Sequence, residues 1–433
     1  MAIREAACGR ALAAALPALL LILLSSPAAA LKWQRVANVP ANGFIAGGPS
    51  SPPKLAMWPS AGVGLLALQE PTPAQFLTTN QGRNWTRISN HYIRSVYMAG
   101  SSAAFAVGQL SSQYSPLNAD SLLRWTRSDN SWSVSLPAPS GSVGISVTQM
   151  EVADGGQTVF VLGSLLFKDK LGLLVLSRPS DGARLQYVWR YQAAANKWDI
   201  IHSRKYSYNA QGSLSSTIAS LSATNGTALW ASWEGAQADG ASAAGLVTFF
   251  NGTAWAAVRS TSRAPVRHLK GVAGQAFAAV QEGTASIHYR TGGQWVRKLT
   301  PSLKAAFFLP VTAPSTNFAL VAEGGLSQQD ALTARLWRWN GTAGTFSSAW
   351  EVGNVNVNDV VVDAASDQRA VAVSVLDTAQ IVARRWFGNK WEPIDTLRCA
   401  TGVVCAVGDL VAMPGGSALM TLVGRGGLWR LEA

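Results

Sequence analysis

Charged residues, histidines and cysteines are all scarce in this chain of 433 residues, with 13% charged residues, four histidines and three cysteines. After the leader, no apolar run reaches the roughly 20 residues that a membrane-spanning helix needs. The histidines lie far apart in sequence, and the few cysteines do not make a zinc site. No G-x-S-x-G, phosphate-loop or H-E-x-x-H motif occurs. These absences argue against a membrane-spanning helix in the mature chain. They also argue against the common hydrolase and nucleotide-binding sites. We expect no metal or other cofactor.

Residues 1–30 have the form of a secretory signal peptide. Arg4 and Arg10 supply the basic start, Ala11–Leu24 the apolar segment, and Ala28–Ala30 the small residues at a cleavage site. We therefore expect residues 31–433 to be exported as a soluble chain. An organelle lumen reached through a similar leader is the alternative.

Cys399 and Cys405 are the cysteines that remain once the leader is removed. In an exported chain a pair at this spacing is expected to form one disulfide. The ring it closes is short, so it should shape a loop rather than hold the fold together. A reduced, buried pair is the other possibility.

The formal charge is +12, of which the leader contributes +1, so the mature chain carries +11. Outside the cell such a charge favours an anionic partner, an acidic polysaccharide or an acidic protein. Nucleic acid is not expected because of the export signal. We expect a monomer.

A strand-turn-strand unit with a tryptophan on the returning strand recurs eight times. These tryptophans are Trp33, Trp85, Trp132, Trp198, Trp255, Trp295, Trp350 and Trp391, and successive gaps are 40 to 66 residues. A four-stranded propeller blade needs about 40–50 residues, and loop insertions account for the longer gaps.

Two further strands of each unit can be recognised from their patterns. The strand before the turn alternates aromatic and basic residues, as in Leu123–Arg127 and Leu336–Trp339. Before it lies a short run of small apolar residues such as Ala104–Gln109 or Val159–Ser164, of which there are eight. Such runs are typical of buried second strands close to the axis of a ring.

The ends of the chain predict how the ring closes. Residues Lys32–Val36 match a returning strand that nothing precedes, and Trp429 lies in an outgoing strand that nothing follows. The sequence therefore predicts an all-β fold, a single β-propeller of eight blades whose N-terminal strand completes the C-terminal blade. Seven blades with one irregular insertion is the alternative.

Two hairpins resemble motifs of known propeller families. Thr78, Asn80, Gly82 and Trp85 resemble the Asp-box of sialidase-like propellers, with Asn80 in place of the usual Asp. Asp154–Gly163, followed by Tyr191 and Trp198, resembles a kelch repeat. The resemblance implies a propeller whose tryptophans brace turns and blade packing. The R-I-P signature of sialidases is missing, and sialidases have six blades, so no sialidase activity is implied.

The loops of a propeller divide between its two faces. Four glycosylation sequons begin at Asn84, Asn225, Asn251 and Asn340, and all fall in turns between first and second or third and fourth strands. We expect this face to carry sugars. The opposite face holds the longest loop insertions, 109–121 and 165–186, together with the Cys399–Cys405 loop.

Propeller function usually lies in loops over a rigid scaffold, so the residues of this opposite face are the candidates. Three blade-to-blade segments, 88–94, 202–209 and 259–268, supply histidine, arginine, lysine and tyrosine, which suit an anionic ligand. The candidate ligand-binding residues are His91, Tyr92, Arg94, His202, Arg204, Lys205, Tyr206, Tyr208, Arg263, Arg267, His268, Glu234 and Glu282. A solvated basic surface without a ligand is the plain alternative.

Polar residues end several second strands: Glu70, Gln109, Glu234, Glu282 and Glu323. They are expected to order the loops of the same face by pairing with arginines. The sequence thus favours an exported binding module, with no catalytic residues assigned. A glycan-processing hydrolase or lyase that uses the recurrent glutamates and tyrosines, and a structural matrix or wall component, are the alternatives.

Overall fold

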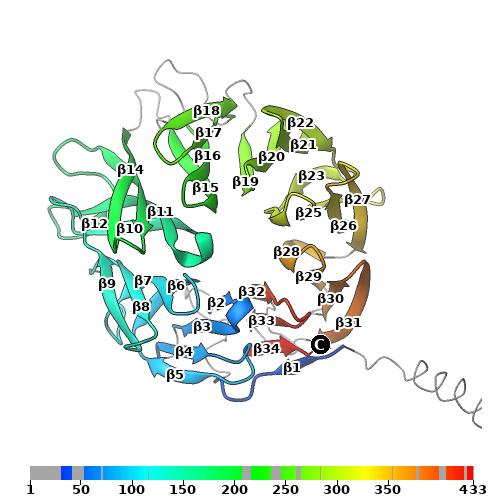
Figure 1. Cartoon of the computed structure of the whole chain (residues 1–433), viewed down its shortest axis with the longest axis horizontal. Coiled ribbons are helices and arrows are strands. Elements are labelled where there is room, and N and C mark those ends of the chain that lie inside the picture. Colours follow the sequence, from blue (N-terminus) through cyan, green and yellow to red (C-terminus); the bar gives the residue numbers. More distant parts are fainter. Residues whose placement is uncertain are drawn as a thin grey trace, which may run out of the picture.

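The computed structural model describes residues 31–40, 53–69, 72–115, 117–206, 216–235, 245–259, 265–282, 284–353, 355–376, 380–398, 406–423 and 427–432. Eight β-sheets form a ring around a central channel (Figure 1). The prediction of an eight-bladed all-β propeller is confirmed, and the seven-blade alternative is wrong. Among the described residues no helix is long and apolar enough to cross a bilayer.

Each blade is an antiparallel sheet, and in blades 1 to 7 its main strands run outward from the channel in chain order. Blade 1 contains β2 (Lys54–Trp58), β3 (Val63–Leu68), β4 (Ala74–Thr78) and β5 (Thr86–Ser89). Blade 2 contains β6 (Tyr92–Met98), β7 (Ala103–Gln109), β8 (Ser121–Thr126) and β9 (Ser131–Leu136). Blade 3 contains β10 (Gly144–Ala153), β11 (Thr158–Lys168), β12 (Leu174–Val175), β13 (Arg184–Gln192) and β14 (Lys197–Tyr206). Blade 4 contains β15 (Thr217–Asn225), β16 (Ala228–Glu234), β17 (Val247–Phe250) and β18 (Trp255–Arg259).

The second half of the ring repeats the arrangement. Blade 5 contains β19 (Val266–Val272), β20 (Gln275–Glu282), β21 (Thr284–Thr291) and β22 (Gln294–Leu299). Blade 6 contains β23 (Lys304–Phe308), β24 (Thr312–Ser315), β25 (Phe318–Leu326), β26 (Leu332–Asn340) and β27 (Thr345–Gly353). Blade 7 contains β28 (Val355–Ser366), β29 (Arg369–Leu376), β30 (Gln380–Phe387) and β31 (Lys390–Arg398). Blade 8 contains β32 (Ala406–Ala412), β33 (Ala418–Val423), β34 (Leu428–Leu431) and β1 (Trp33–Arg35).

The first and last strands of the chain close the ring. β1 pairs antiparallel with β34, so that Trp33 lies opposite Leu431 and Arg35 opposite Trp429. This pairing supplies the outer strand that blade 8 would otherwise lack, and it covers the exposed edge of β34. The closure predicted from the unmatched half-hairpins at the two termini is therefore present.

The hydrophobic core is divided among the junctions between blades. One buried cluster lies at each of the eight junctions. The second strands are buried on both faces, as their small apolar residues predict; Ala104 and Ala106 of β7, for example, pack towards blade 1. Because every cluster joins two neighbouring blades, each blade depends on the ring for its core.

The turn from Thr78 to Trp85 has the structure that its Asp-box resemblance implies. The Asn80 side chain accepts a hydrogen bond from the backbone N–H of Asn84 at 2.9 Å, as an aspartate would. Gln81 and Gly82 have φ of 61° and 77°, and glycine adopts such values without strain. Trp85 is buried and donates its Nε1–H to the Gly82 carbonyl at 3.0 Å. Trp85 is thus a packing residue.

In blade 6 the tryptophan lies further along the returning strand than in the other hairpins. In the other hairpins the tryptophan follows the turn closely, as when Trp391 lies opposite Trp386. In blade 6 the returning strand begins earlier, so Phe346 lies opposite Trp339 and Trp350 lies further along, opposite Leu336. Phe346 packs on Trp339 with ring centroids 5.2 Å apart, so an aromatic pair is kept with a different residue.

Candidate functional site

The propeller has two faces that differ in their loops. We call the face with the turns between first and second and between third and fourth strands the tight-turn face, and the opposite one the long-loop face. Four exposed asparagines lie in turns of the tight-turn face: Asn84, Asn225, Asn251 and Asn340. In two of these sequons the asparagine Oδ1 accepts the hydroxyl of the sequon threonine, Thr227 at 3.0 Å and Thr253 at 2.9 Å. The asparagine Oδ1 atoms therefore face their own turns.

On the long-loop face, glutamine side chains hold the loops in place. Gln109 donates to the carbonyls of Ser115 and Asn118, both at 3.0 Å, and accepts the Ser115 N–H at 3.1 Å. Gln186 pairs in the same way with both backbone groups of Ile218 in the next blade, at 2.8 and 2.9 Å. These amides order the loops that the sequence assigned to arginine–carboxylate pairs, because an amide offers both a donor and an acceptor to a backbone edge.

The first predicted cluster, His91, Tyr92 and Arg94, makes contacts that hold the loops of the long-loop face in place. The Gln75 side chain bonds both backbone groups of His91, and the tilted rings of Tyr92 and Tyr114 pack with centroids 4.7 Å apart. Arg94 pairs with the nearly buried Asp120 at 3.1 Å. Burial raises the pKa of Asp120, and Arg94 acts against that rise. His91, Tyr92 and Arg94 come together on the long-loop face, yet their polar groups serve the fold.

The second predicted cluster is not a loop. His202, Arg204, Lys205 and Tyr206 belong to β14, which continues because β13 pairs with it as far as Tyr206, opposite Arg184. His202 lies between the rings of Trp233 and Trp255, at 5.5 and 5.9 Å. Burial lowers its pKa, with a smaller contribution from Arg204.

The other members of this strand are also committed to contacts within the protein. Arg204 lies 5.4 Å from the centroid of the Trp233 ring, Lys205 pairs with Asp181 at 2.8 Å, and the Tyr206 hydroxyl lies 3.3 Å from that of Ser164. The strand joins blades 3 and 4 rather than presenting a ligand-binding loop.

Several predicted residues lie outside the described part of the chain. These are Tyr208, Arg263, Glu70, Cys399, Cys405 and the side chain of Glu282. Glu234 is described; it ends β16 and is exposed.

The third predicted cluster does form a cavity. Arg267 and His268 are the second and third residues of β19 and line a recess of about 250 Å³ between blades 5 and 6. The other lining residues are Ala279, Val280, Gln281, Ala285, Phe307 and Phe308. Arg267 is exposed and His268 half-buried. Burial lowers the pKa of His268, Arg267 adds to that effect, and a hydrogen bond with the Phe308 backbone opposes it. At neutral pH the cavity therefore has one cationic side chain, at its edge, beside a neutral imidazole.

An irregular inner strand forms the far wall of this cavity. In β23, Lys304 pairs with Leu326 and Phe307 with Gly324, so the two residues between them form a bulge opposite Gly325. Ala305 in the bulge has φ of +47°, a left-handed conformation that is uncommon for alanine. A Cβ on Gly325 would lie 2.8 Å from both the Leu303 Cβ and the Lys304 carbonyl oxygen. Glycine at position 325 is what allows the bulged strand to approach so closely.

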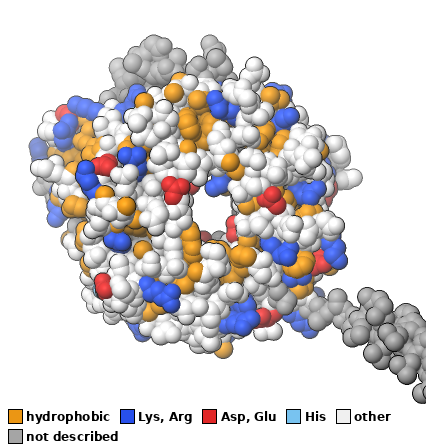
Figure 2. Space-filling view, viewed as in Figure 1, with side chains coloured by type: hydrophobic (Ala, Val, Ile, Leu, Met, Phe, Trp, Pro, Cys, Tyr) orange, Lys and Arg blue, Asp and Glu red, His pale blue; other side chains and the backbone are white. Residues whose placement is uncertain are grey.

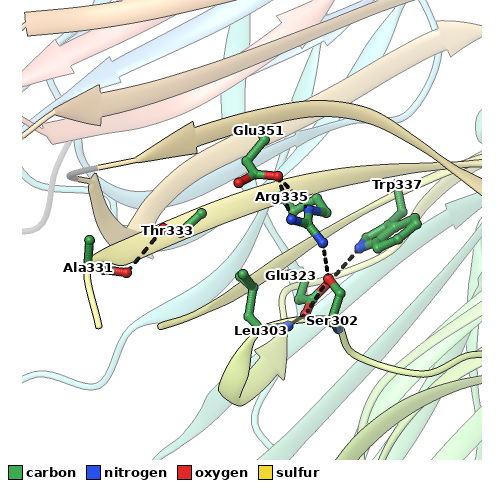
Figure 3. A network of polar contacts seen from close by, with 8 residues as sticks. All are labelled: Ser302, Leu303, Glu323, Ala331, Thr333, Arg335, Trp337 and Glu351. Carbon is green, nitrogen blue, oxygen red and sulfur yellow. Dashed lines mark hydrogen bonds and ion pairs between the residues drawn. The ribbon is translucent and has the colours of Figure 1, made fainter. Parts of the chain in front are cut away.

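A buried carboxylate holds the start of this strand (Figure 3). Glu323, which lies opposite Phe308 in the sheet, has no exposed surface. Its carboxylate accepts the backbone N–H groups of Ser302 and Leu303, each at 2.7 Å, and the indole N–H of Trp337 at 2.6 Å. Arg335 extends the network by bonding the Ser302 hydroxyl and pairing with Glu351. Glu323 does order a loop, as expected, but through amides and an indole.

Much of the positive charge is used between blades. Several arginines of third strands lie over aromatic rings of a neighbouring blade, such as Arg124 over Tyr191 at 5.4 Å and Arg338 over Trp386 at 4.6 Å. On the face shown in Figure 2, lysines and arginines are scattered around the ring and form no single patch. The aromatic–basic alternation of the third strands is therefore mainly a feature of blade packing. Fewer basic side chains are available to a ligand than the net charge indicates.

The central channel, visible as the opening in Figure 2, has a second cavity of about 400 Å³ lined in part by Lys54, Tyr97, Glu151 and Asp409. Asp409 accepts the Leu55 N–H of the next blade at 2.7 Å, and Asp363 likewise accepts that of Ala412 at 2.8 Å. Burial raises the pKa of both carboxyl groups. These acids link inner strands, and the described residues contain no cluster of three or more His, Cys, Asp or Glu that could hold a metal ion.

Comparison with known proteins supports the β-propeller fold and assigns no family. The chain matches no protein-family model and no curated protein sequence. Among solved structures, Sqt1 from Saccharomyces cerevisiae is 8% identical with a TM-score of 0.51 and covers 93% of this chain and 98% of its own. YCF48 from Cyanidioschyzon merolae is 13% identical with a TM-score of 0.44 and the same two coverages. A YCF48 structure bound to D1 peptide is 11% identical with a TM-score of 0.43, covering 93% and 97%.

An oligogalacturonate lyase from Vibrio parahaemolyticus is also similar, at 9% identity, a TM-score of 0.47 and coverage of 80% of this chain and 94% of its own. The similar structures thus include a propeller bound to a peptide and one named as a lyase. At these identities the likeness shows the β-propeller fold alone, since one fold supports many functions.

Sequence reasoning named two of the cavity residues but not the cavity. One wall of the recess is formed by Phe307 and Phe308, which directly follow the bulge in β23. The one local signal is the Glu-Gly-Gly run at 323–325, which in a buried strand indicates a close backbone approach.

Proposed function

We propose that this chain is an exported, N-glycosylated propeller that binds an anionic partner, an acidic glycan or an acidic protein segment, through its long-loop face. The cavity beside Arg267 carries the proposal. An exposed guanidinium lies at the edge of a recess built on strands, and no ion pair among the described residues involves it. Arginine at such a position is suited to a bidentate bond with a carboxylate.

The distribution of sequons supports the choice of face. All four lie on the tight-turn face, so glycans there leave the long-loop face uncovered. Peptide mapping of the exported protein should find glycans at positions such as Asn225 and Asn251 and a mature N-terminus at Leu31. Glycans on long-loop segments, or an intact leader, would contradict this part of the proposal.

Binding can be tested with oligogalacturonate and polyglutamate as anionic probes. We expect affinity that falls between about 50 and 300 mM salt and that is weakened by Arg267→Ala. Arg127→Ala is the matched control, because Arg127 is an exposed arginine beside a tight turn. Equal effects of the two substitutions, or no salt-sensitive binding of either probe, would sink the proposal.

A glycan-processing hydrolase or lyase is the rival. It requires turnover of the acidic glycan that is lost in Glu234→Gln or Glu282→Gln. Glu323 is poorly suited to such chemistry, because its carboxylate already accepts from two amides, a hydroxyl and an indole. A structural matrix or wall component would show neither salt-sensitive binding nor turnover.

A further inference from the structure

Five of the eight side chains that line the cavity between blades 5 and 6 are apolar. Of the eight lining residues, only Arg267, His268 and Gln281 carry polar side chains. Ala279, Val280, Ala285 and Phe308 are buried and offer a ligand only carbon surface. The recess, at about 250 Å³, is smaller than the roughly 300–1,000 Å³ of pockets that hold drug-sized ligands. Its size suits a single side chain.

This composition separates the two classes of anionic partner. A sugar ring brings hydroxyl groups around its whole edge, whereas His268 and Gln281 are the only lining side chains besides Arg267 that can bond them. Hydroxyls that lie against Ala279, Val280, Ala285 and the phenylalanines lose their hydrogen bonds to water, and each unpaired buried group costs about 1–3 kcal/mol. An apolar side chain has no such groups and gains from leaving water. The interior of the recess therefore favours an apolar residue of a protein over a uronic acid ring.

The edge of the recess supplies the charge preference. Arg267 is the only cationic side chain among the lining residues, and the neighbouring imidazole is neutral at neutral pH because burial lowers the pKa of His268. One guanidinium balances the charge of one carboxylate, and its two parallel N–H groups can bond the two carboxylate oxygens.

We propose that the recess binds an apolar side chain of an acidic protein segment, with an adjacent carboxylate paired to Arg267. This inference rests on the proposed function, whose anionic partner it narrows to a peptide. The carboxylate belongs either to the C-terminus of the segment or to an aspartate or glutamate beside the apolar residue.

The strand that forms the far wall is held before any ligand arrives. Glu323 fixes the backbone of Ser302 and Leu303 with two hydrogen bonds of 2.7 Å, directly before the bulge that contains Ala305. Left-handed backbone at a non-glycine residue tends to persist at binding sites, where surrounding contacts enforce it. A wall fixed in this way lowers the cost of ordering the site on binding.

The test uses the full mature chain and fluorescent peptides measured by anisotropy. One peptide, labelled-Gly-Gly-Gly-Leu, has a free C-terminal carboxylate; a second is its C-terminal amide; a third has glycine in place of leucine. A fourth peptide carries Asp-Leu internally between glycines, with an amidated end. Oligogalacturonate serves as the glycan probe. The C-terminal and internal arms distinguish the two sources of the carboxylate.

We expect at least one of the two leucine peptides that carry a carboxylate to bind at least about tenfold more tightly than the leucine amide and the glycine peptide. Arg267→Ala should remove that advantage of the carboxylate, whereas Lys170→Ala, at an exposed lysine on the same face in blade 3, should not. Ala285→Val, which fills part of the recess, should weaken the leucine peptide and leave the glycine peptide unchanged. Thermal unfolding of each variant establishes that it is folded.

The outcomes separate this inference from the function on which it rests. Salt-sensitive, Arg267-dependent binding of oligogalacturonate without any preference for leucine would overturn the inference and leave the anionic function standing. Absence of salt-sensitive binding by every anionic probe would overturn both. A leucine preference that survives both Arg267→Ala and Ala285→Val would show that the apolar residue binds elsewhere and would also overturn the inference.

Discussion

Substitution of Glu323 by glutamine is the most incisive perturbation of the wall beside the cavity. Glu323 is fully buried, and its two carboxylate oxygens accept from the amides of Ser302 and Leu303 and from the indole of Trp337. Glutamine has one acceptor oxygen and one NH2 group. Whichever way the amide is turned, at least one donor then faces another donor. Glu323→Gln therefore removes a hydrogen bond and leaves buried N–H groups unpaired.

The expected loss of stability follows from these contacts. A hydrogen bond to a charged group contributes about 1.5–3 kcal/mol, and a buried donor left without a partner costs about 1–3 kcal/mol. Part of this overlaps, so we expect the free energy of unfolding to fall by about 3 kcal/mol. For a chain of roughly 400 residues, with about 2 cal/mol/K of unfolding entropy per residue, the Tm falls by about 4 °C.

Glu351→Gln is the matched control within the same network. Glu351 pairs with Arg335 but is half-exposed, so its loss should cost less than about 1 kcal/mol. Thermal unfolding followed by tryptophan fluorescence measures the Tm of both variants, and amide hydrogen exchange measures protection at Ser302 and Leu303. Both amides should exchange faster in Glu323→Gln and stay protected in Glu351→Gln. Equal Tm losses, or unchanged protection of both amides in Glu323→Gln, would refute this account of the wall.

Three further perturbations test the fold around the site. Trp33→Ala should lower the free energy of unfolding by about 3–5 kcal/mol and speed amide exchange in β34, its partner strand; slow exchange there would contradict closure by β1. Gly325→Ala should cost about 1–3 kcal/mol, because the new Cβ meets the Leu303 Cβ and the Lys304 carbonyl oxygen at 2.8 Å, and a stable variant would contradict the close approach. Burial lowers the pKa of His202 below 6.5 in the folded protein. As pH falls below 6.5, His202 is therefore protonated more readily in the unfolded chain than in the folded one, and the folded state loses stability. Between about pH 7 and pH 5.5 the Tm of His202→Phe should therefore fall less than the Tm of the unmodified chain. Equal falls of Tm in the two proteins would contradict this prediction.

The fold was predictable because each blade is encoded locally. Period-two alternation, small apolar second strands and polar turns recur in every unit, and the unmatched halves at Trp33 and Trp429 indicate the closure. Backbone pairing between strands adjacent in sequence needs little long-range information. Trp350 shows the limit of this reasoning: it lies in the returning strand, as predicted, but Phe346 is closer to the turn and makes the aromatic contact with Trp339.

The candidate site was only partly predictable. His91, Arg94, His202 and Arg204 have residue types that suit an anionic ligand, but the structure commits them to neighbouring loops, rings and carboxylates. Whether a cation is free depends on what the next blade places beside it, and that contact joins residues far apart in sequence. The arginines of the third strands are used in this way as well, which no count of net charge reveals.

The sequence by itself determined the eight-bladed ring, its closure by the first strand and the division of loops between two faces, because each follows from patterns within single blades. Only the tertiary structure decided which candidates share a cavity. Arg267 and His268 line it with Phe307 and Phe308 of the next blade, which directly follow the β23 bulge opposite Gly325. The repeats specify how each blade is built. The cavity is lined by residues of two blades, so its formation depends on how those blades pack against each other.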